Sequence, residues 1–239
     1  MGRDVIGFAL RMSDRLRSTM KFARHSHRTV FSRIYSERYW GDDESVSGIG
    51  SRMAFTESIR HELPRLIEQY RVGRLFDAPC GDLNWIRPVL EQTKVDYVGG
   101  DIVPEVVELA RRNSPSESYE FTVFDITGDR FPTADLWLCR DVLFHLSFDN
   151  IWKALANFAR SDVGLMLVTT HTAPNIVNRD IWNGDFRLID LFKPPFSLPR
   201  SIVLDRFPDY AEPQPERDMI LLRRQDVAEH LRAVGREPR

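Results

Sequence analysis

The chain has 239 residues, of which 42% are hydrophobic and 28% charged, and its formal net charge is −2. This composition is typical of a soluble globular protein with one sizeable domain and extensions. No apolar run is long enough to cross a bilayer, and the first residues lack the apolar core of a secretory signal. The cysteines, Cys80 and Cys139, are too few for a disulfide framework and show no zinc-ligand spacing. We therefore expect a protein of the reducing cytoplasm.

The charge is unevenly distributed, because residues 1–38 carry a net charge of +6 and the remainder −8. Apolar residues from Val5 to Ala23 recur at helical spacing and predict a basic amphipathic helix over residues 4–35. Through residues 1–35 the chain could contact an anionic membrane surface or an acidic partner. We favour the alternative, in which this helix packs on the domain and exposes its arginines. The acidic remainder argues against nucleic-acid binding.

Residues 40–51 are rich in glycine and serine and predict a loop. A helix is expected over residues 56–70, where Pro64 favours a kink or a later start. Helical patterns and apolar runs then alternate. Strands are expected at 74–76, 95–100, 119–124, 135–139 and 163–170, and helices at 83–92, 104–112 and 151–160. The last of these helices is expected to be capped by Asp149.

This alternation predicts an α/β fold with a doubly wound, parallel sheet. Residues 188–199 read as a loop. Residues 201–207 and 218–223 are expected to form a final strand pair, and residues 225–234 a last helix.

Acidic residues end three successive predicted strands. Asp77, Asp101 and Asp125 are 24 residues apart, and the carboxyl ends of parallel strands meet at one edge of a sheet. Ionised carboxylates accept hydrogen bonds without donating them, so such a rim suits a ribose diol and an amino group. A dinucleotide-binding fingerprint has three glycines that let the backbone approach a pyrophosphate, but here only Gly81 is present. This favours an adenosine ligand without phosphates. A single acid at a strand end is usually a cap or a turn residue, but three at equal spacing favour a ligand site.

The run Asp77-Ala78-Pro79-Cys80-Gly81-Asp82 resembles the first motif of class I S-adenosylmethionine-dependent methyltransferases, with Ala-Pro-Cys where a second glycine is common. Residues 135–146 resemble the fourth strand and following turn of that family, and the resemblance spans about residues 50–172. It implies a Rossmann-like methyltransferase fold with a mostly parallel seven-stranded sheet, closed by an antiparallel hairpin and preceded by an N-terminal helical extension. We expect a basic helix and lid segment over residues 1–55 and a methyltransferase domain over residues 56–239.

The resemblance further implies S-adenosylmethionine as cofactor, with S-adenosylhomocysteine as product. It assigns the ribose hydroxyls to Asp101 and the adenine to Asp125 and Ile126, and it folds the N-terminal segment over the methionine end as a lid. The cofactor-binding residues it implies are Asp77, Ala78, Pro79, Cys80, Gly81, Asp82, Trp85, Asp101, Ile102, Asp125, Ile126, Arg140, Trp40 and Arg52.

A hydroxyl acceptor needs a base close to the sulfonium. His145, which follows the fourth predicted strand, is the first candidate, and Asp141 would orient it if the intervening turn is helical. His171, directly after the fifth strand, is the rival base. Either ring could instead be a capped or core-satisfied histidine. No Asp/Glu/His cluster predicts a dedicated metal site.

The leading hypothesis is methylation of a hydroxyl on a sugar or glycoconjugate. Trp182, Asn183, Asp185 and Phe186 have the aromatic and polar character that suits a sugar ring. The segments around residues 39–51 and 77–82 are similar to bacterial methyltransferases encoded near glycan-building enzymes, including rhizobial enzymes that 2-O-methylate the fucose of nodulation signals. The alternatives are an N-methyltransferase acting on a small-molecule amine or amino sugar, an adenosine-ligand sensor, and a nicotinamide-dependent oxidoreductase, which the missing glycines disfavour.

Overall fold

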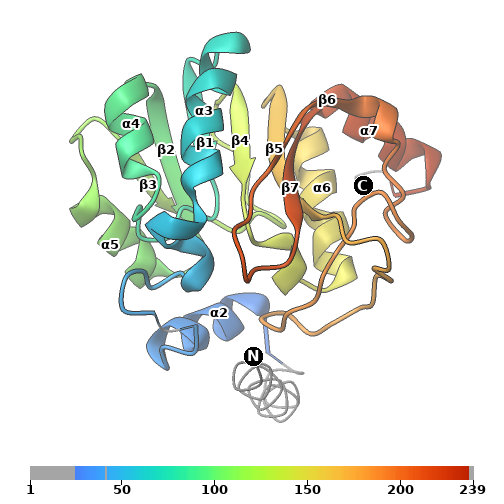
Figure 1. Cartoon of the computed structure of the whole chain (residues 1–239), viewed down its shortest axis with the longest axis horizontal. Coiled ribbons are helices and arrows are strands. Elements are labelled where there is room, and N and C mark those ends of the chain that lie inside the picture. The colour runs from blue at the N-terminus through green and yellow to red at the C-terminus, as the bar shows by residue number, and fades with distance from the viewer. Residues whose placement is uncertain (1–24, 41, 237–239) are drawn as a thin grey trace.

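The computed structural model describes residues 25–40 and 42–236, and over these residues the chain forms one seven-stranded sheet (Figure 1). The strand order is β3-β2-β1-β4-β5-β7-β6. The strands β1 to β5 are parallel, and β7 runs antiparallel to both β5 and β6. Their bounds are β1 Arg74–Asp77, β2 Asp96–Asp101, β3 Glu120–Val123, β4 Leu136–Cys139, β5 Leu165–His171, β6 Val203–Pro208 and β7 Arg217–Arg223. The predicted doubly wound sheet and its C-terminal hairpin are therefore confirmed.

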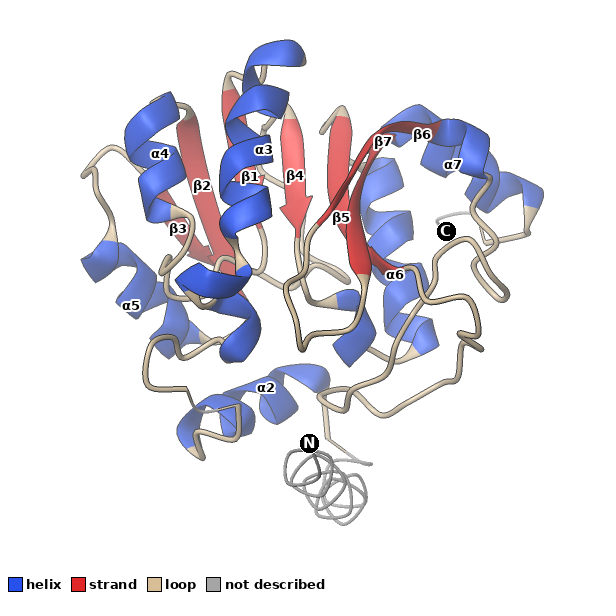
Figure 2. Cartoon of the chain, in the orientation of Figure 1, coloured by secondary structure: helices blue, strands red, loops and turns tan. Residues whose placement is uncertain are grey.

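Helices cover both faces of this sheet (Figure 2). The helices on the faces are α3 (Glu57–Gln69), α4 (Arg87–Thr93), α5 (Pro104–Asn113), α6 (Phe148–Arg160) and α7 (Arg224–Ala233), and a further helix is α2 (His27–Ser36). Successive strand residues point to opposite faces, so Leu75 packs in a cluster with α3 and α4, whereas Phe76 packs with α6 and α7. Strand β4, Leu-Trp-Leu-Cys, is buried throughout because both of its faces are covered.

Three local expectations differ from the structure. Helix α6 is capped by Ser147, whose Oγ accepts a hydrogen bond from the Asn150 amide, while Asp149 lies in the first turn and pairs with Lys153. Helix α3 begins at Glu57 and continues through Pro64, since burial of its apolar face outweighs the one backbone hydrogen bond that proline cannot donate. Helix α4 begins only at Arg87, so Pro88 occupies its first turn.

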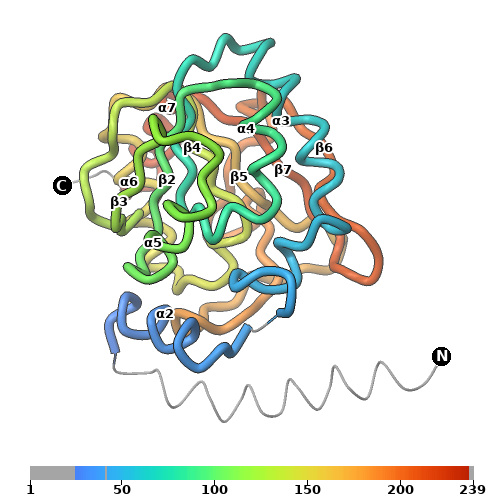
Figure 3. The backbone as a smooth tube through the Cα atoms, turned by 90° about the vertical axis from the view of Figure 1, so that its left-hand side faces the viewer, coloured from blue at the N-terminus to red at the C-terminus, as the bar shows by residue number. Residues whose placement is uncertain are grey.

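Helix α2 lies across the carboxyl ends of the parallel strands (Figures 1 and 3). The Oγ of Ser26 caps it by accepting from the Thr29 amide, and Val30 and Ile34 form its buried face. This helix is the described end of the amphipathic segment predicted over residues 4–35, and the residues from Val5 to Ala23 lie outside the described part of the chain. The division between residues 55 and 56 stays a prediction. Among the helices of the described residues, none has the length and apolar character that crossing a membrane requires.

Candidate active site

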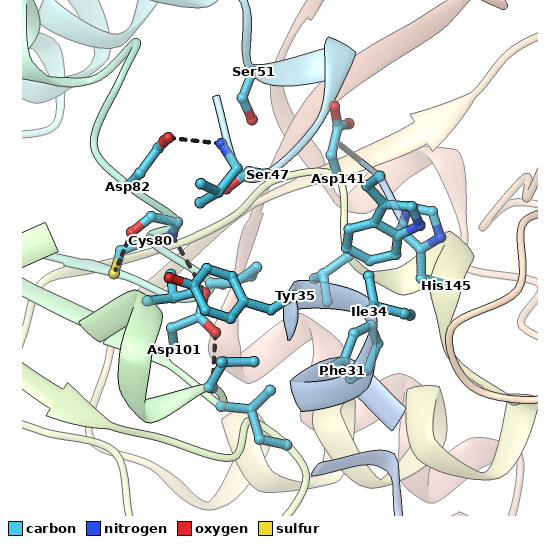
Figure 4. A pocket seen from close by; sticks show the side chains of 18 of the residues that line it. Phe31, Ile34, Tyr35, Ser47, Ser51, Cys80, Asp82, Asp101, Asp141 and His145 are labelled. Atoms are coloured by element: carbon cyan, nitrogen blue, oxygen red, sulfur yellow. Dashed lines mark hydrogen bonds between the residues drawn. The ribbon is translucent and has the colours of Figure 1, made fainter. Parts of the chain in front are cut away.

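A cavity lies between α2 and the carboxyl ends of β1, β2 and β4. Figure 4 shows Cys80, Asp82 and Asp101 on one side of it and Asp141 and His145 on the other, with side chains of α2 beneath. The strand ends and the segments after them contribute Pro79, Cys80, Gly81, Asp82, Trp85, Asp101, Ile102, Val103, Val106, Arg140, Asp141, Val142 and His145. Helix α2 and the loop after it contribute Phe31, Ile34, Tyr35, Trp40, Val46, Ser47 and Ser51.

The turn after β1 is tied to the loop that follows α2. Gly81 has a φ of +58°, and a Cβ there would lie 2.3 Å from the Ser47 Oγ. The two carboxylate oxygens of Asp82 accept from the Ser45 Oγ and the Val46 amide, both at 2.9 Å. A side chain at residue 81 would therefore displace the loop that closes this side of the cavity.

Asp101 ends β2 and presents a carboxylate to the cavity. Its Oδ1 accepts from the Val103 amide at 3.0 Å and its Oδ2 from the Gly81 amide at 3.4 Å. Burial raises the pKa of Asp101 to about 6, although these backbone donors act in the opposite direction. At neutral pH the group is ionised, and an ionised carboxylate accepts hydrogen bonds from a ribose diol.

Asp77 and Asp125 are the other two acids of the equally spaced set. Neither is among the described residues that line this cavity. Asp77 is 2% exposed and accepts from the Tyr97 hydroxyl at 2.8 Å, and burial raises its pKa to about 8. The Oδ2 of Asp125 lies 2.7 Å from the Nε2 of His27 in α2. Partial burial acts to raise the pKa of Asp125, but hydrogen bonds from His27 and Thr127 lower it to about 2. Ala78 and Ile126 are buried in the core that packs against α6.

Two arginines and two aspartates form a network that includes the cavity-lining residues Arg140 and Asp141. The Nε of Arg140 donates to Asp209 at 2.7 Å, and its Nη1 donates to the Gly50 carbonyl at 3.0 Å. The Asp141 carboxylate accepts from the Arg217 Nη2 at 3.2 Å and lies 3.3 Å from the Arg140 Nη1. Burial acts to raise the pKa of Asp141, but the two arginines outweigh it and lower that pKa. Asp141 is therefore held as a carboxylate by arginines.

His145 is oriented differently from the sequence-based expectation. Its Nδ1 lies 2.8 Å from the Asp185 carbonyl oxygen, and because a carbonyl only accepts, this nitrogen carries the proton. Asp141 has a φ of +53°, which interrupts the helical geometry that would place it beside His145. The group that orients His145 is thus a backbone carbonyl from a distant loop. The lone pair of the neutral ring is on Nε2.

His171 is buried at the end of β5 and does not line the cavity. Its Nδ1 accepts from the Ile189 amide at 3.2 Å, and burial lowers its pKa to about 4. A neutral, buried ring that accepts this hydrogen bond agrees with the alternative given above, in which His171 is a hydrogen-bonded histidine of the core. Arg52 also lies away from the cavity wall, and its guanidinium pairs with Asp42 at 2.6 Å.

The wall that sequence reasoning missed comes from α2 and its loop. Phe31, Ile34 and Tyr35 of α2 line the cavity and are not among the predicted site residues, although their helical spacing is a signal that could have indicated a common face. Ser47 lies in the predicted loop, where only the fold brings it next to Gly81. Trp40, which was expected in the lid, does line the cavity.

These residues fit S-adenosylmethionine. The Nη2 of Arg140 is buried on the cavity wall without a hydrogen-bond partner, and a carboxylate such as that of a methionine moiety would satisfy it. Asp101 offers the acceptor that a ribose needs. Phe31 and Tyr35, which line the cavity, supply apolar surface for a purine ring.

Comparisons with known proteins give a domain match and similarities of fold. Residues 76–161 match a family model described as a methyltransferase domain. Among solved structures, human N-acetylserotonin methyltransferase in complex with SAM is 17% identical, with a TM-score of 0.60 over 93% of this chain and 68% of that one. Magnesium protoporphyrin IX methyltransferase from Synechocystis PCC 6803, with bound SAH, is 12% identical, with a TM-score of 0.56 over 83% of this chain and 100% of that one.

Mitomycin 7-O-methyltransferase is 18% identical, with a TM-score of 0.52 over 69% of this chain and 53% of that one. No curated protein matches the chain in sequence. Likenesses at these identities establish the fold, and the family match covers the part of the chain from β1 to α6. The chain therefore has the fold of these methyltransferases, and its residues 76–161 match the methyltransferase domain.

Proposed function

We propose that the enzyme methylates a hydroxyl group of a sugar or glycoconjugate, with His145 as the general base. The observation that carries this proposal is the hydrogen bond from the His145 Nδ1 to the Asp185 carbonyl. This bond fixes the tautomer whose Nε2 accepts a proton, and the ring lies on the cavity wall. A hydroxyl acceptor requires such a base, whereas an amine reaches the site partly deprotonated and requires it less.

The remaining residues are assigned to binding. When bound, S-adenosylmethionine supplies the methyl group. Asp101 accepts hydrogen bonds from its ribose, and Arg140 holds its carboxylate. Trp40, whose ring centroid lies 4.5 Å from that of His145, provides an aromatic surface beside the base, and aromatic faces pack well on the apolar faces of sugar rings.

Replacing His145 tests the hydroxyl acceptor directly. In His145→Ala we expect kcat to fall by about 10²- to 10⁴-fold and the rise of kcat with pH to disappear, because the proton acceptor is lost. His61→Ala is the matched control, since His61 is exposed on α3 with 81% of its side chain accessible. A loss below about tenfold with an unchanged pH profile would instead favour an amine acceptor.

The acceptor class is tested with a panel of compounds and a methyl-labelled cofactor. We expect transfer to neutral sugars and glycosides, with fucosides as the first members of the panel. Amino sugars and simple amines are the second group. Label found only on nitrogen would contradict the proposal and support N-methylation.

A further inference from the structure

One short segment holds the turn that carries His145. Residues 183–187 approach the 3₁₀ turn Leu143–His145 along its length, and their backbone and side chains bind all three of its carbonyls. The bonds run from the Gly184 amide to the His145 carbonyl at 2.7 Å, from the Arg187 amide to the Phe144 carbonyl at 3.3 Å, and from the Arg187 Nη1 to the Leu143 carbonyl at 3.2 Å. With the ring bond to the Asp185 carbonyl, this segment determines both the backbone and the ring orientation of His145.

The same segment is in contact with α2. Gly184 is buried and has a φ of +86°, and a Cβ there would lie 2.5 Å from the Val30 Cγ1 and 2.8 Å from the Ile34 Cδ1. Helix α2 therefore packs directly on the Gly184 backbone. Any shift of α2 towards or away from the domain acts on the residue that precedes Asp185.

A second contact joins α2 to His145 through aromatic rings. Trp40, which follows α2, has its ring centroid 4.5 Å from that of His145 with an interplanar angle of 34°. The Phe31 ring of α2 meets the Trp40 ring edge-on at 5.8 Å. His145 is thus in contact both with the segment 183–187 and with Trp40, the residue that links it to α2.

We infer that Gly184 is a positioning residue that couples the seating of α2 to the alignment of His145. The inference rests on the proposed function, because it requires His145 to act as a base. Close-packed interiors transmit small displacements, and a 1 Å misplacement of a reacting group can cost about 100-fold in rate. When α2 covers the cavity and packs on Gly184, the Asp185 carbonyl and the Trp40 ring hold His145 in place. The base is aligned when the cavity is closed.

Gly184→Ala tests this coupling by inserting a methyl group between the segment and α2. We expect kcat to fall by about 10- to 100-fold and the pH at which kcat rises to shift, because the Nδ1 contact that sets the basicity of His145 is displaced. Adding Val30→Ala, which removes the nearest contact, should raise kcat at least about fivefold above that of Gly184→Ala alone. Gly235→Ala is the matched control, since Gly235 also has a positive φ of +67° but has no atom within 4 Å of its Cβ position, and its kcat should stay unchanged.

Combining Gly184→Ala with His145→Ala separates this inference from the proposed function. If Gly184 acts through His145, its substitution should cost nothing further once His145 is alanine. An unchanged kcat in His145→Ala alone would overturn the proposed function. Suppose instead that His145→Ala lowers kcat strongly. If Gly184→Ala then has no effect on kcat, or has the same effect in the wild type and in His145→Ala, only the coupling is overturned.

If Gly184→Ala does not fold, variants of Trp40 test the same coupling. Trp40→Leu removes the ring that faces His145 and should lower kcat by about tenfold or more, whereas Trp40→Phe keeps an aromatic face and should retain most of it. A Leu variant that is as active as the Phe variant, or a Leu effect that persists undiminished in His145→Ala, would contradict the coupling.

Discussion

Asp101 combines burial with a proposed role, ribose binding, that requires charge. Its side chain is 8% exposed, and burial raises its pKa to about 6, closer to neutrality than that of an ordinary carboxyl group. The protonated form can accept fewer hydrogen bonds than the ionised one. Cofactor affinity should therefore depend on pH through this residue.

We predict that the Kd for S-adenosylmethionine rises about tenfold between pH 7.5 and pH 5, because about nine-tenths of the Asp101 groups are then protonated in the free enzyme. Asp101→Asn should bind about 10- to 100-fold more weakly at pH 7.5 and lose this pH dependence. Isothermal titration calorimetry at both pH values gives the measurement. Glu105→Gln, an exposed acid in the first turn of α5, should behave like the wild type. A variant at residue 101 that keeps both affinity and pH dependence would remove the ribose role.

Spacing in the sequence located the strand ends that carry Asp77, Asp101 and Asp125, but it could not assign their surroundings. Asp77 faces the Tyr97 hydroxyl from the neighbouring strand, and Asp125 faces His27, which is 98 residues earlier in the chain. These partners are created by packing between distant segments. Periodicity describes only how each segment is arranged by itself, so it cannot reveal them.

At the scale of elements, α2 is the part of the site that depends most on long-range contacts. Its first turn is joined to the domain by the pair between His27 and Asp125, and its later turns by packing of Val30 and Ile34 on Gly184. Hydrogen bonding keeps the pKa of Asp125 low, so the carboxylate stays ionised at neutral pH and remains an acceptor for His27. This pair should stabilise the closed position of the helix.

We predict that His27→Ala increases amide hydrogen exchange across residues 27–36 by about fivefold, which corresponds to about 1 kcal/mol for a partly exposed, charge-assisted hydrogen bond. Exchange measured by mass spectrometry resolves this helix from the sheet. Arg28→Ala changes an exposed neighbour in the same turn and should leave the exchange rates close to wild type. Equal rates in the two variants would mean that the pair contributes nothing to holding α2.

The turn after β4 shows why an element can be predicted while its geometry is not. The strand was expected from its apolar run, and the spacing of Asp141 and His145 suggested one helical face. A positive φ at Asp141 and the 3₁₀ turn at Leu143–His145 rotate the two side chains onto different partners. The deviation is stabilised by Arg217, Thr169 and the segment 183–187, which lie far away in the sequence.

For the whole molecule, the sheet order follows from alternating strands and helices, and it was predictable for that reason. The same topology buries acids beneath the site, because parallel strands covered on both faces leave little solvent at their centre. Asp77 is the clearest case. Its pKa of about 8 in the folded protein is far above the value of about 3.9 in an unfolded chain.

The sign of the resulting effect on stability follows from proton binding. Between about pH 4 and pH 8 the folded protein retains a proton on Asp77 that the unfolded chain releases, so this group makes the free energy of unfolding fall as pH rises. Over pH 5 to 7.5 the difference approaches one proton, which gives at most about 3 kcal/mol. Asp77→Asn keeps the shape and an acceptor for Tyr97 but cannot titrate, so its stability should fall less over that range. Urea unfolding at the two pH values measures the difference, with exposed Asp162→Asn as the control. Identical pH dependence in Asp77→Asn and the wild type would show that this carboxyl is ionised in the folded protein. The core beneath the site would then carry a negative charge before any ligand binds.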